Sequence, residues 1–432
     1  MKYVLSKENM NLLLEVSTIM GEAKKDTKGI LTIGATVWNN KLLCLYSIPT
    51  ERDQSDVQFL MDMPEGFEQG SRLVISVNNQ NKDSGQNDFV TILRAMLSFN
   101  EDAYIDIDNN NVSIGVSTKA KAQLLCLSEA PMELVMGQPL TAFSAKSKDM
   151  RTFISKSSIY TGGSGSTLNA CWTLDTTTGI IRGFSTDCYT MSKSKVSVEM
   201  AKATGNEAFD AELKKSEEAF EEYLKSNPMQ KKDNFMLIIP DISRDRLSKF
   251  LGASDVCMMQ TDGKHIFVQI NNSIAYTFVM GATAISEDNI NGVLAMQEAV
   301  SVGFDNYAFM KAVEFISILT ASSSHDPKIM ISVGEKETQL SFVGLDVSTK
   351  VKNMDFAGQE AEICVNLSFL KKIISSLSKG GIVIRIIDGR NKVAKFYNGT
   401  VAEVDETSAI ALLGINVSSV DDAEENESSD EE

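Results

Sequence analysis

Apolar and polar residues follow one order that recurs three times along the chain. The first copy has alternating apolar residues at 72–77, helically spaced apolar residues at 88–97, and alternating residues again at 103–108 and 111–116. A period of two predicts strands, and three-and-four spacing predicts an amphipathic helix. The same order returns at 235–240, 243–251, 255–260 and 265–270, and at 361–365, 368–377, 382–387 and 392–397. The pattern therefore predicts three copies of a strand, a helix and a hairpin.

Each of these hairpins has an aspartate at its turn. Asp108 precedes an Asn pair, and Asp262 and Asp388 each precede a glycine. Such pairs accept the positive φ that tight hairpins require. A further helix followed by strands lies upstream of each copy, with the helices at 9–20, 149–160 and 308–319. The chain is therefore expected to contain six half-motifs, two in each of three tandem domains.

The predicted fold class is α+β, and the expected domains are residues 1–140, 141–294 and 295–415. The length of 432 residues also favours about three domains. One segment, 205–227, interrupts the repeat and is expected to be a helical insertion in the second domain. Its apolar stripe consists of Phe209, Leu213, Phe220 and Leu224. A packed surface helix is the simpler interpretation, and a helix that binds a partner is the alternative.

The formal net charge is −17, but it is unevenly distributed. The last twelve residues hold eight carboxylates and no basic residue, so residues 1–420 carry −9. Residues 416–432 are expected to form a disordered acidic tail. The chain has no apolar stretch of the roughly 20 residues that span a bilayer, and its N-terminus has no secretory pattern. These features predict a cytoplasmic protein.

Catalytic and metal-binding patterns are weak. The six cysteines are scattered, with no C-x-x-C pair, so a zinc site is not expected and buried reduced thiols are. The two histidines, His265 and His325, offer little to a histidine-centred triad. The glycine-rich loop 161–167 lacks the Gly-Lys-Ser/Thr ending of a phosphate-binding loop. The sequence therefore predicts no enzymatic activity and no cofactor, although paired carboxylates could still meet in the fold.

The second domain carries a family resemblance. Leu168-Asn169-Ala170 precedes the run Ser185-Thr186-Asp187-Cys188-Tyr189-Thr190-Met191. This spacing, together with Phe153–Lys156 and Ile238–Pro240, resembles the bacterial DNA polymerase III sliding clamp (β subunit). The family has Gly-His-Arg-Leu where this chain has residues 188–191, and Met-Pro where it has Leu413-Gly414. The departures are those of a diverged member, such as a virus could encode.

The resemblance implies a head-to-tail homodimer that closes a six-domain ring around duplex DNA. Such a ring is a processivity factor in DNA replication, found at the nucleoid or, for a viral protein, in the host cytoplasm. It further implies a hydrophobic pocket that receives short peptides from the polymerase and the clamp loader. By position, the pocket residues are Leu168, Thr186, Cys188, Tyr189, Met191, Leu413, Gly414 and Ile415.

A ring that slides on DNA must hold phosphates without reading bases, so basic residues are expected on the pore-lining helices. The candidates are Arg94 in the first domain, Lys146, Lys148, Arg151, Lys156, Arg244, Arg246 and Lys249 in the second, and Lys371, Lys372 and Lys379 in the third. Ordinary solvated helix faces are the alternative explanation. Two other functions stay open: a clamp-like protein-binding scaffold that no longer encircles DNA, and an enzyme on the same architecture.

Overall fold

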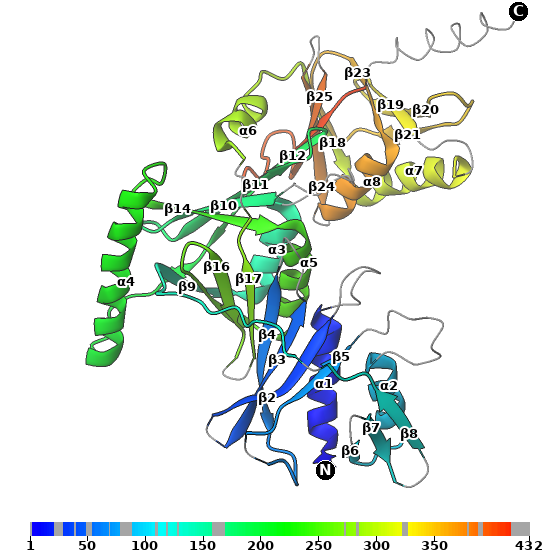
Figure 1. The fold of residues 1–432 in the computed structure, drawn as a ribbon. Helices are drawn as coiled ribbons and strands as arrows, with labels where there is room; N and C mark the ends of the chain where they lie inside the picture. Colours follow the sequence, from blue (N-terminus) through cyan, green and yellow to red (C-terminus); the bar gives the residue numbers. More distant parts are fainter. Residues whose placement is uncertain are drawn as a thin grey trace, which may run out of the picture. The chain divides into compact units, whose positions relative to one another are not determined.

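The structure, a computed structural model, describes residues 2–20, 29–38, 40–48, 54–68, 70–77, 89–108, 111–117, 120–127, 129–157, 169–271, 274–281, 285–321, 327–377, 380–387 and 392–415. The chain forms two compact units (Figure 1). Unit 1 comprises Met1–Arg151 and Val198–Ala282, and unit 2 comprises Thr152–Ser197 and Thr283–Glu432. Helix α3 (Ser147–Ser157) begins in unit 1 and ends in unit 2.

Unit 1 contains helices and antiparallel strands. Its helices are α1 (Lys7–Met20), α2 (Phe89–Leu97), α4 (Glu207–Ser226), α5 (Asp241–Phe250) and a 3-10 turn at Leu251–Ala253. Its strands are β1 (Lys2–Leu5), β2 (Ile30–Trp38), β3 (Lys41–Ile48), β4 (Ser55–Asp62), β5 (Leu73–Ser76), β6 (Ala103–Asp108), β7 (Asn111–Val116), β8 (Ala120–Leu124), β9 (Thr141–Lys146), β13 (Glu199–Met200), β14 (Asn234–Pro240), β15 (Val256–Thr261), β16 (His265–Gln269) and β17 (Ile274–Val279).

Unit 2 has the same kinds of element. Its helices are α6 (Glu287–Leu294), α7 (Asn306–Leu319) and α8 (Leu367–Ser376). Its strands are β10 (Asn169–Asp175), β11 (Ile180–Thr186), β12 (Thr190–Ser197), β18 (Val300–Asp305), β19 (Lys328–Val333), β20 (Glu337–Phe342), β21 (Ser348–Lys352), β22 (Asp355–Gly358), β23 (Ala361–Asn366), β24 (Gly381–Ile387), β25 (Val393–Asn398) and β26 (Ser408–Leu413).

The predicted helix and hairpin of each half-motif are confirmed, and the structure adds a third antiparallel strand after each hairpin. The six copies are α1-β2-β3-β4, α2-β6-β7-β8, α3-β10-β11-β12, α5-β15-β16-β17, α7-β19-β20-β21 and α8-β24-β25-β26. A lead strand precedes each helix and pairs with the other half-motif of the same repeat, as β1 does with β6 and β18 with β24. The α+β fold of three doubled repeats therefore follows from the chain's periodicity.

Successive repeats are joined by continuous β-ladders. Strand β4 of the first repeat pairs with β17 of the second, from Ser55↔Phe278 to Phe59↔Ile274. Strand β12 of the second repeat pairs with β26 of the third, from Thr190↔Leu412 to Ser194↔Ser408. In both cases the third strand of a first half-motif meets the third strand of the next repeat's second half-motif. We call this the third-strand rule. It explains why the border of the two units falls inside the second repeat.

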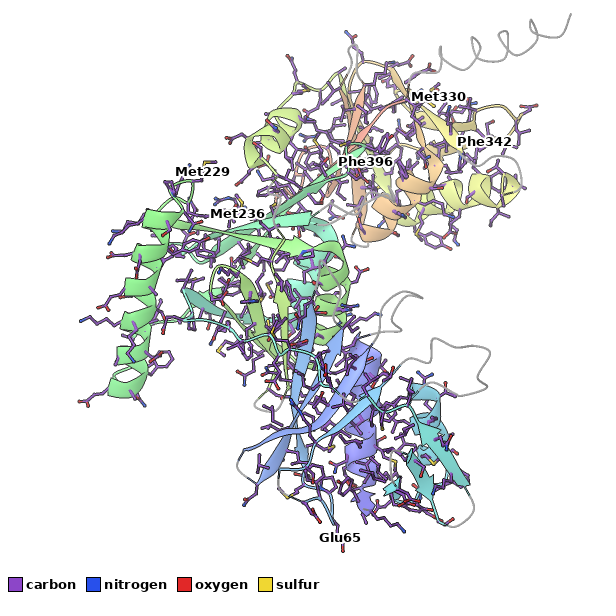
Figure 2. The ribbon with its side chains drawn as sticks, in the orientation of Figure 1. Glu65, Met229, Met236, Met330, Phe342 and Phe396 are labelled. Atoms are coloured by element: carbon purple, nitrogen blue, oxygen red, sulfur yellow. The ribbon has the colours of Figure 1, made fainter. Side chains whose placement is uncertain are left out.

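The sheet of unit 2 that runs β10-β11-β12-β26-β25-β24-β18-β22 is covered on both faces. Ile382, Ile384 and Ile386 face the main core, which includes α7, α8 and the sheet β21-β20-β19-β23. Phe396 and Phe342, labelled in Figure 2, come from these two sheets and share that core. Side chains alternate along a strand, so Val383 and Ile387 face the opposite side, where they form clusters with residues of α6. Helix α6 therefore lies on the opposite face of the sheet from α7 and α8.

The segment expected to be a helical insertion forms α4. Asn206 caps it by accepting hydrogen bonds from the backbone N–H groups of Ala208 and Phe209. The rings of Phe220 and Tyr223 lie 5.3 and 5.5 Å from that of Phe235 on β14, so the helix is attached to unit 1 by part of its apolar stripe. Phe209 remains 44% exposed. Within the described residues, no helix has the length and apolar character needed to cross a membrane.

Candidate peptide surface and nucleic-acid interface

A tight turn between β11 and β12 presents the residues that carry the family resemblance. The buried Asp187 carboxylate accepts from the N–H groups of Tyr189 (3.0 Å) and Thr190 (2.6 Å) and from the Thr190 hydroxyl (2.8 Å). The Thr186 hydroxyl donates to the Thr190 carbonyl at 2.8 Å and accepts from the Cys188 N–H at 3.1 Å. Cys188 has a φ of 71°. These bonds fix the turn and leave the Tyr189 side chain 56% exposed.

The end of β26 lies beside this turn. The Leu413 N–H donates to the Tyr189 carbonyl at 2.8 Å, and Met191 is the register partner of Ala411. Beyond the strand, the N–H of Gly414 donates to the Lys392 carbonyl at 2.8 Å. A Cβ at Gly414 would lie 2.9 Å from that carbonyl oxygen, which disfavours any larger residue. The structure thus brings together the predicted pocket residues of 186–191 and of 413–415.

Apolar side chains adjoin the turn in two groups. Met191 packs on a buried cluster of the sheet, Ile387, Val393 and Ala411, and Val293 and Leu294 of α6 pack on the same cluster. On the α8 side, the ring of Phe369 lies 6.0 Å from that of Tyr189.

We define the peptide surface by the seven described pocket candidates and three residues that the structure adds. The candidates are Thr186, Cys188, Tyr189, Met191, Leu413, Gly414 and Ile415, and the additions are Val293, Leu294 and Phe369. Leu168 lies outside the described residues. In the sequence, the added residues are apolar helix positions of the kind that usually lie in a core. Only their neighbours in the structure show that they belong to the peptide surface.

The exposed basic candidates in unit 1 are Arg94, Lys146, Lys148, Arg151 and Lys249. The Arg244 side chain is only 14% exposed and forms an ion pair with Asp245 at 3.0 Å.

Arg246 does not fit the predicted role in DNA binding. It is buried, and its Nε donates to the Met20 carbonyl at 3.2 Å and its guanidinium to the Ser55 hydroxyl at 2.7 Å. Its guanidinium binds the end of α1 and the start of β4, so Arg246 is not a candidate for binding DNA phosphates.

In unit 2, Lys371 and Lys372 of α8 are exposed, and the Lys371 ammonium donates to Ser317 of α7 at 2.9 Å. Lys379 lies outside the described residues. Lys156 is buried, with its ammonium 3.9 Å from the Asp405 carboxylate, so it is not a candidate for binding DNA phosphates either. Burial acts to raise the pKa of Asp405, but hydrogen bonds from Thr407 and the charge of Lys156 bring it below its ordinary value.

Four cysteines are buried, namely Cys44, Cys171, Cys257 and Cys364, while Cys188 of the turn is exposed. Burial raises the pKa of Cys44 to about 12, which keeps it a protonated thiol.

An open polar hollow of about 720 Å³ is lined by residues of β19, β20, β21 and β23, where Ser332 donates to Glu362 at 2.7 Å and Lys350 pairs with Glu337. Across the described ranges, no three His, Cys, Asp or Glu side chains gather as a metal site would require.

The chain has the fold of bacterial DNA polymerase III β subunits. It matches the β subunit of Thermotoga maritima with a TM-score of 0.71 at 10% identity, over 96% of this chain and 99% of that one. It matches a Pseudomonas aeruginosa sliding clamp bound to griselimycin with a TM-score of 0.69 at 12% identity, over 96% and 100%. The sliding clamp of Bacillus subtilis gives 0.69 at 13% identity, over 96% and 99%. No protein-family model and no curated protein matches the sequence.

Proposed function

We propose that the chain is a diverged DNA sliding clamp. Two copies would join head to tail into a ring around duplex DNA and tether replication proteins through the peptide surface. The third-strand rule is the observation that carries this proposal. It pairs β4 with β17 and β12 with β26, which leaves β21 and β8 as the two third strands with no partner of this kind.

Both remaining strands are free to pair with a second copy. Among the described residues, β8 and β21 are edge strands of two four-stranded sheets, in the orders β1-β6-β7-β8 and β21-β20-β19-β23. An edge strand presents unpaired N–H and C=O groups that favour pairing with another chain. If β21 of one copy pairs with β8 of the next, the same rule joins every repeat of the assembly.

Exposed apolar residues support the same contact between copies, the pairing of β21 with β8, which we call the seam. Next to the β4–β17 ladder, α1 contacts α5 and β4. The equivalent helices at the proposed seam are α7, which contacts β21, and α2 of the second copy. Helix α7 leaves Phe315, Ile318 and Leu319 exposed at 48%, 74% and 53%, and Phe99 just after α2 is 50% exposed. Burying such residues contributes roughly 25 cal/mol per Å² of apolar surface, so a second copy would be stabilised there.

Contact with DNA would be made through phosphates. Several exposed cations lie on helices of the repeats or at the borders of these helices. They are Lys146, Lys148 and Arg151 on and before α3, Lys249 on α5, and Lys371 and Lys372 on α8. Such residues release counterions from DNA without reading sequence. The peptide surface offers apolar side chains of the kind that anchor short peptides, with backbone groups fixed by the 186–190 turn. Neither role involves chemistry by the chain.

The oligomer is tested by light scattering coupled to size exclusion. We expect a mass near twice 47.3 kDa and a monomer for Ile318→Glu. The matched control is Met229→Glu, because Met229 is a 96% exposed apolar residue just beyond α4, labelled in Figure 2. If wild type is a monomer at high concentration, or if Ile318→Glu stays a dimer, the seam is wrong.

The function is tested on primed circular DNA with a replicative polymerase and its clamp loader. We expect the dimer to remain on closed circles and to slide off after linearisation, and to increase the length of products made per binding event. A dimer that binds polymerase peptides but is not retained on circular DNA would instead identify the protein-binding scaffold.

A further inference from the structure

Helix α6 is attached to the sheet of unit 2 at three points. At its start, Glu287 pairs with Arg182 of β11 at 3.2 Å. In its middle, Asn291 accepts from the Lys193 ammonium of β12 at 2.6 Å. At its end, the chain from Leu294 to Glu298 is held by Lys395 of β25. The first two contacts come from the second repeat and the third from the third repeat, so α6 bridges the β12–β26 ladder.

The Lys395 contact is unusual because the cation is fully buried. Its ammonium donates to the carbonyls of Leu294 (2.8 Å) and Met296 (2.7 Å) and to the Glu298 carboxylate (2.8 Å). Its side chain is 0% exposed. An ammonium has three N–H donors, and all three have an acceptor here. The carbonyl of Leu294 belongs to the C-terminal end of α6, where the helix dipole favours a cation.

The same residues form one side of the peptide surface. The Leu294 carbonyl is bound by Lys395, while the side chains of Leu294 and its neighbour Val293 pack on the same buried cluster of the sheet as Met191 does. The sheet surface under them, formed by Ile387, Val393 and Ala411, is fixed by its β-ladders. The end of α6 has no ladder, so its position depends on the groups that hold its carbonyls.

We propose that Lys395 is a positioning residue for the peptide surface. By fixing the end of α6, its buried ammonium holds Val293 and Leu294 on the cluster of Ile387, Val393 and Ala411, on which Met191 also packs, and so sets the width of the apolar site. The predicted effect on ligand affinity rests on the proposed peptide-binding function. The placement of α6 by Lys395 does not, and it can be tested separately. A residue that touches no ligand would then decide how well the site binds one.

The test uses the full-length chain and two measurements. Amide hydrogen exchange reports on residues 287–299, and calorimetric titration with griselimycin reports on the site, because that compound binds a P. aeruginosa clamp of the same fold. The variants are Lys395→Met, which removes the charge with little change in length, and Glu298→Gln, which keeps an acceptor oxygen but removes its charge. Lys156→Met is the matched control, since Lys156 is also a buried cation of unit 2 beside a carboxylate, Asp405.

We expect Lys395→Met to speed exchange at 293–299 at least tenfold and to weaken griselimycin at least tenfold. Glu298→Gln should produce smaller changes in the same direction, and Lys156→Met should change neither. Unchanged exchange at the end of α6, or unchanged affinity despite faster exchange, overturns the proposal. If Lys395→Met does not fold, Glu298→Gln decides by the same criteria. If the wild-type protein does not bind griselimycin, the proposed peptide-binding function fails this test. The exchange data then decide by themselves whether Lys395 places the end of α6.

Discussion

Replacing Cys188 by glycine should stabilise the protein, although it removes a side chain. Cys188 has a φ of 71°, a left-handed conformation in which a Cβ approaches the following carbonyl. The conformation is imposed, because Asp187 and Thr186 bind the backbone on both sides of it. The left-handed region costs a non-glycine residue about 1–2 kcal/mol, and glycine returns about 0.4–1 kcal/mol of this through the entropy of the unfolded chain. The difference between the midpoints of these two ranges is a net gain of about 0.8 kcal/mol.

Urea denaturation followed by circular dichroism measures the change. Cys188→Gly should move the midpoint to higher urea with an unchanged slope, because the slope reports the surface exposed on unfolding. Cys188→Ala is the matched control, since it removes the thiol but keeps the Cβ and should leave the midpoint near wild type. A glycine variant no more stable than the alanine variant would show that the turn is not strained, and the reasoning would be refuted.

Three further predictions concern named side chains. Lys371→Glu with Lys372→Glu should weaken binding to circular duplex DNA and lower the salt dependence of log K by about 0.9 per lost phosphate contact, measured by titration at several salt concentrations; an unchanged slope would exclude α8 from the interface. Arg246→Met should destabilise unit 1 by about 2 kcal/mol, because the Met20 carbonyl loses a charged donor, yet leave DNA affinity unaltered, and a selective loss of DNA binding would contradict its removal from the interface. Asp262 should contribute stability at neutral pH. Burial acts to raise its pKa, but hydrogen bonds from the His265 ring and backbone N–H groups bring it below the ordinary 3.8, so the contribution is lost as pH falls through 3.8 toward the lowered value. Unfolding measured against pH should therefore show a flatter acid arm for Asp262→Asn, and identical arms would disprove this.

The periodicity of the sequence was sufficient to predict the helix and the hairpin of each half-motif, but not the third strand. Each half-motif buries one helix stripe against one sheet face, so its apolar positions are close in sequence and repeat regularly. The Asp262-Gly263 turn was predicted for the same local reason, and Gly263 has a φ of 86°. The corresponding turns after Asp108 and Asp388 lie outside the described residues.

The ladders between repeats could not be predicted from the pattern. The pairing of Met191 with Ala411 joins residues more than two hundred positions apart, and period-two alternation says which face a residue takes but not which strand lies beside it. The basic candidates show a related limit. Arg246 and Lys156 occupy helix positions where an exposed cation is normal, and only the tertiary structure shows that they are buried beside Met20 and Asp405. The site residues on α6 and α8 were missed because apolar helix residues are usually core.

The third-strand rule has a consequence for assembly. A head-to-tail contact leaves the same two strands free at the ends of any open assembly, so copies must either return to the start or continue as a filament. The rotation from one repeat to the next decides between these outcomes, and any change at the β12–β26 ladder is repeated once in every copy. The bridge that α6 makes across this ladder would therefore act on symmetry as well as on ligand binding. In the proposed ring, loosening this bridge in every copy would change the rotation between repeats on which closure depends.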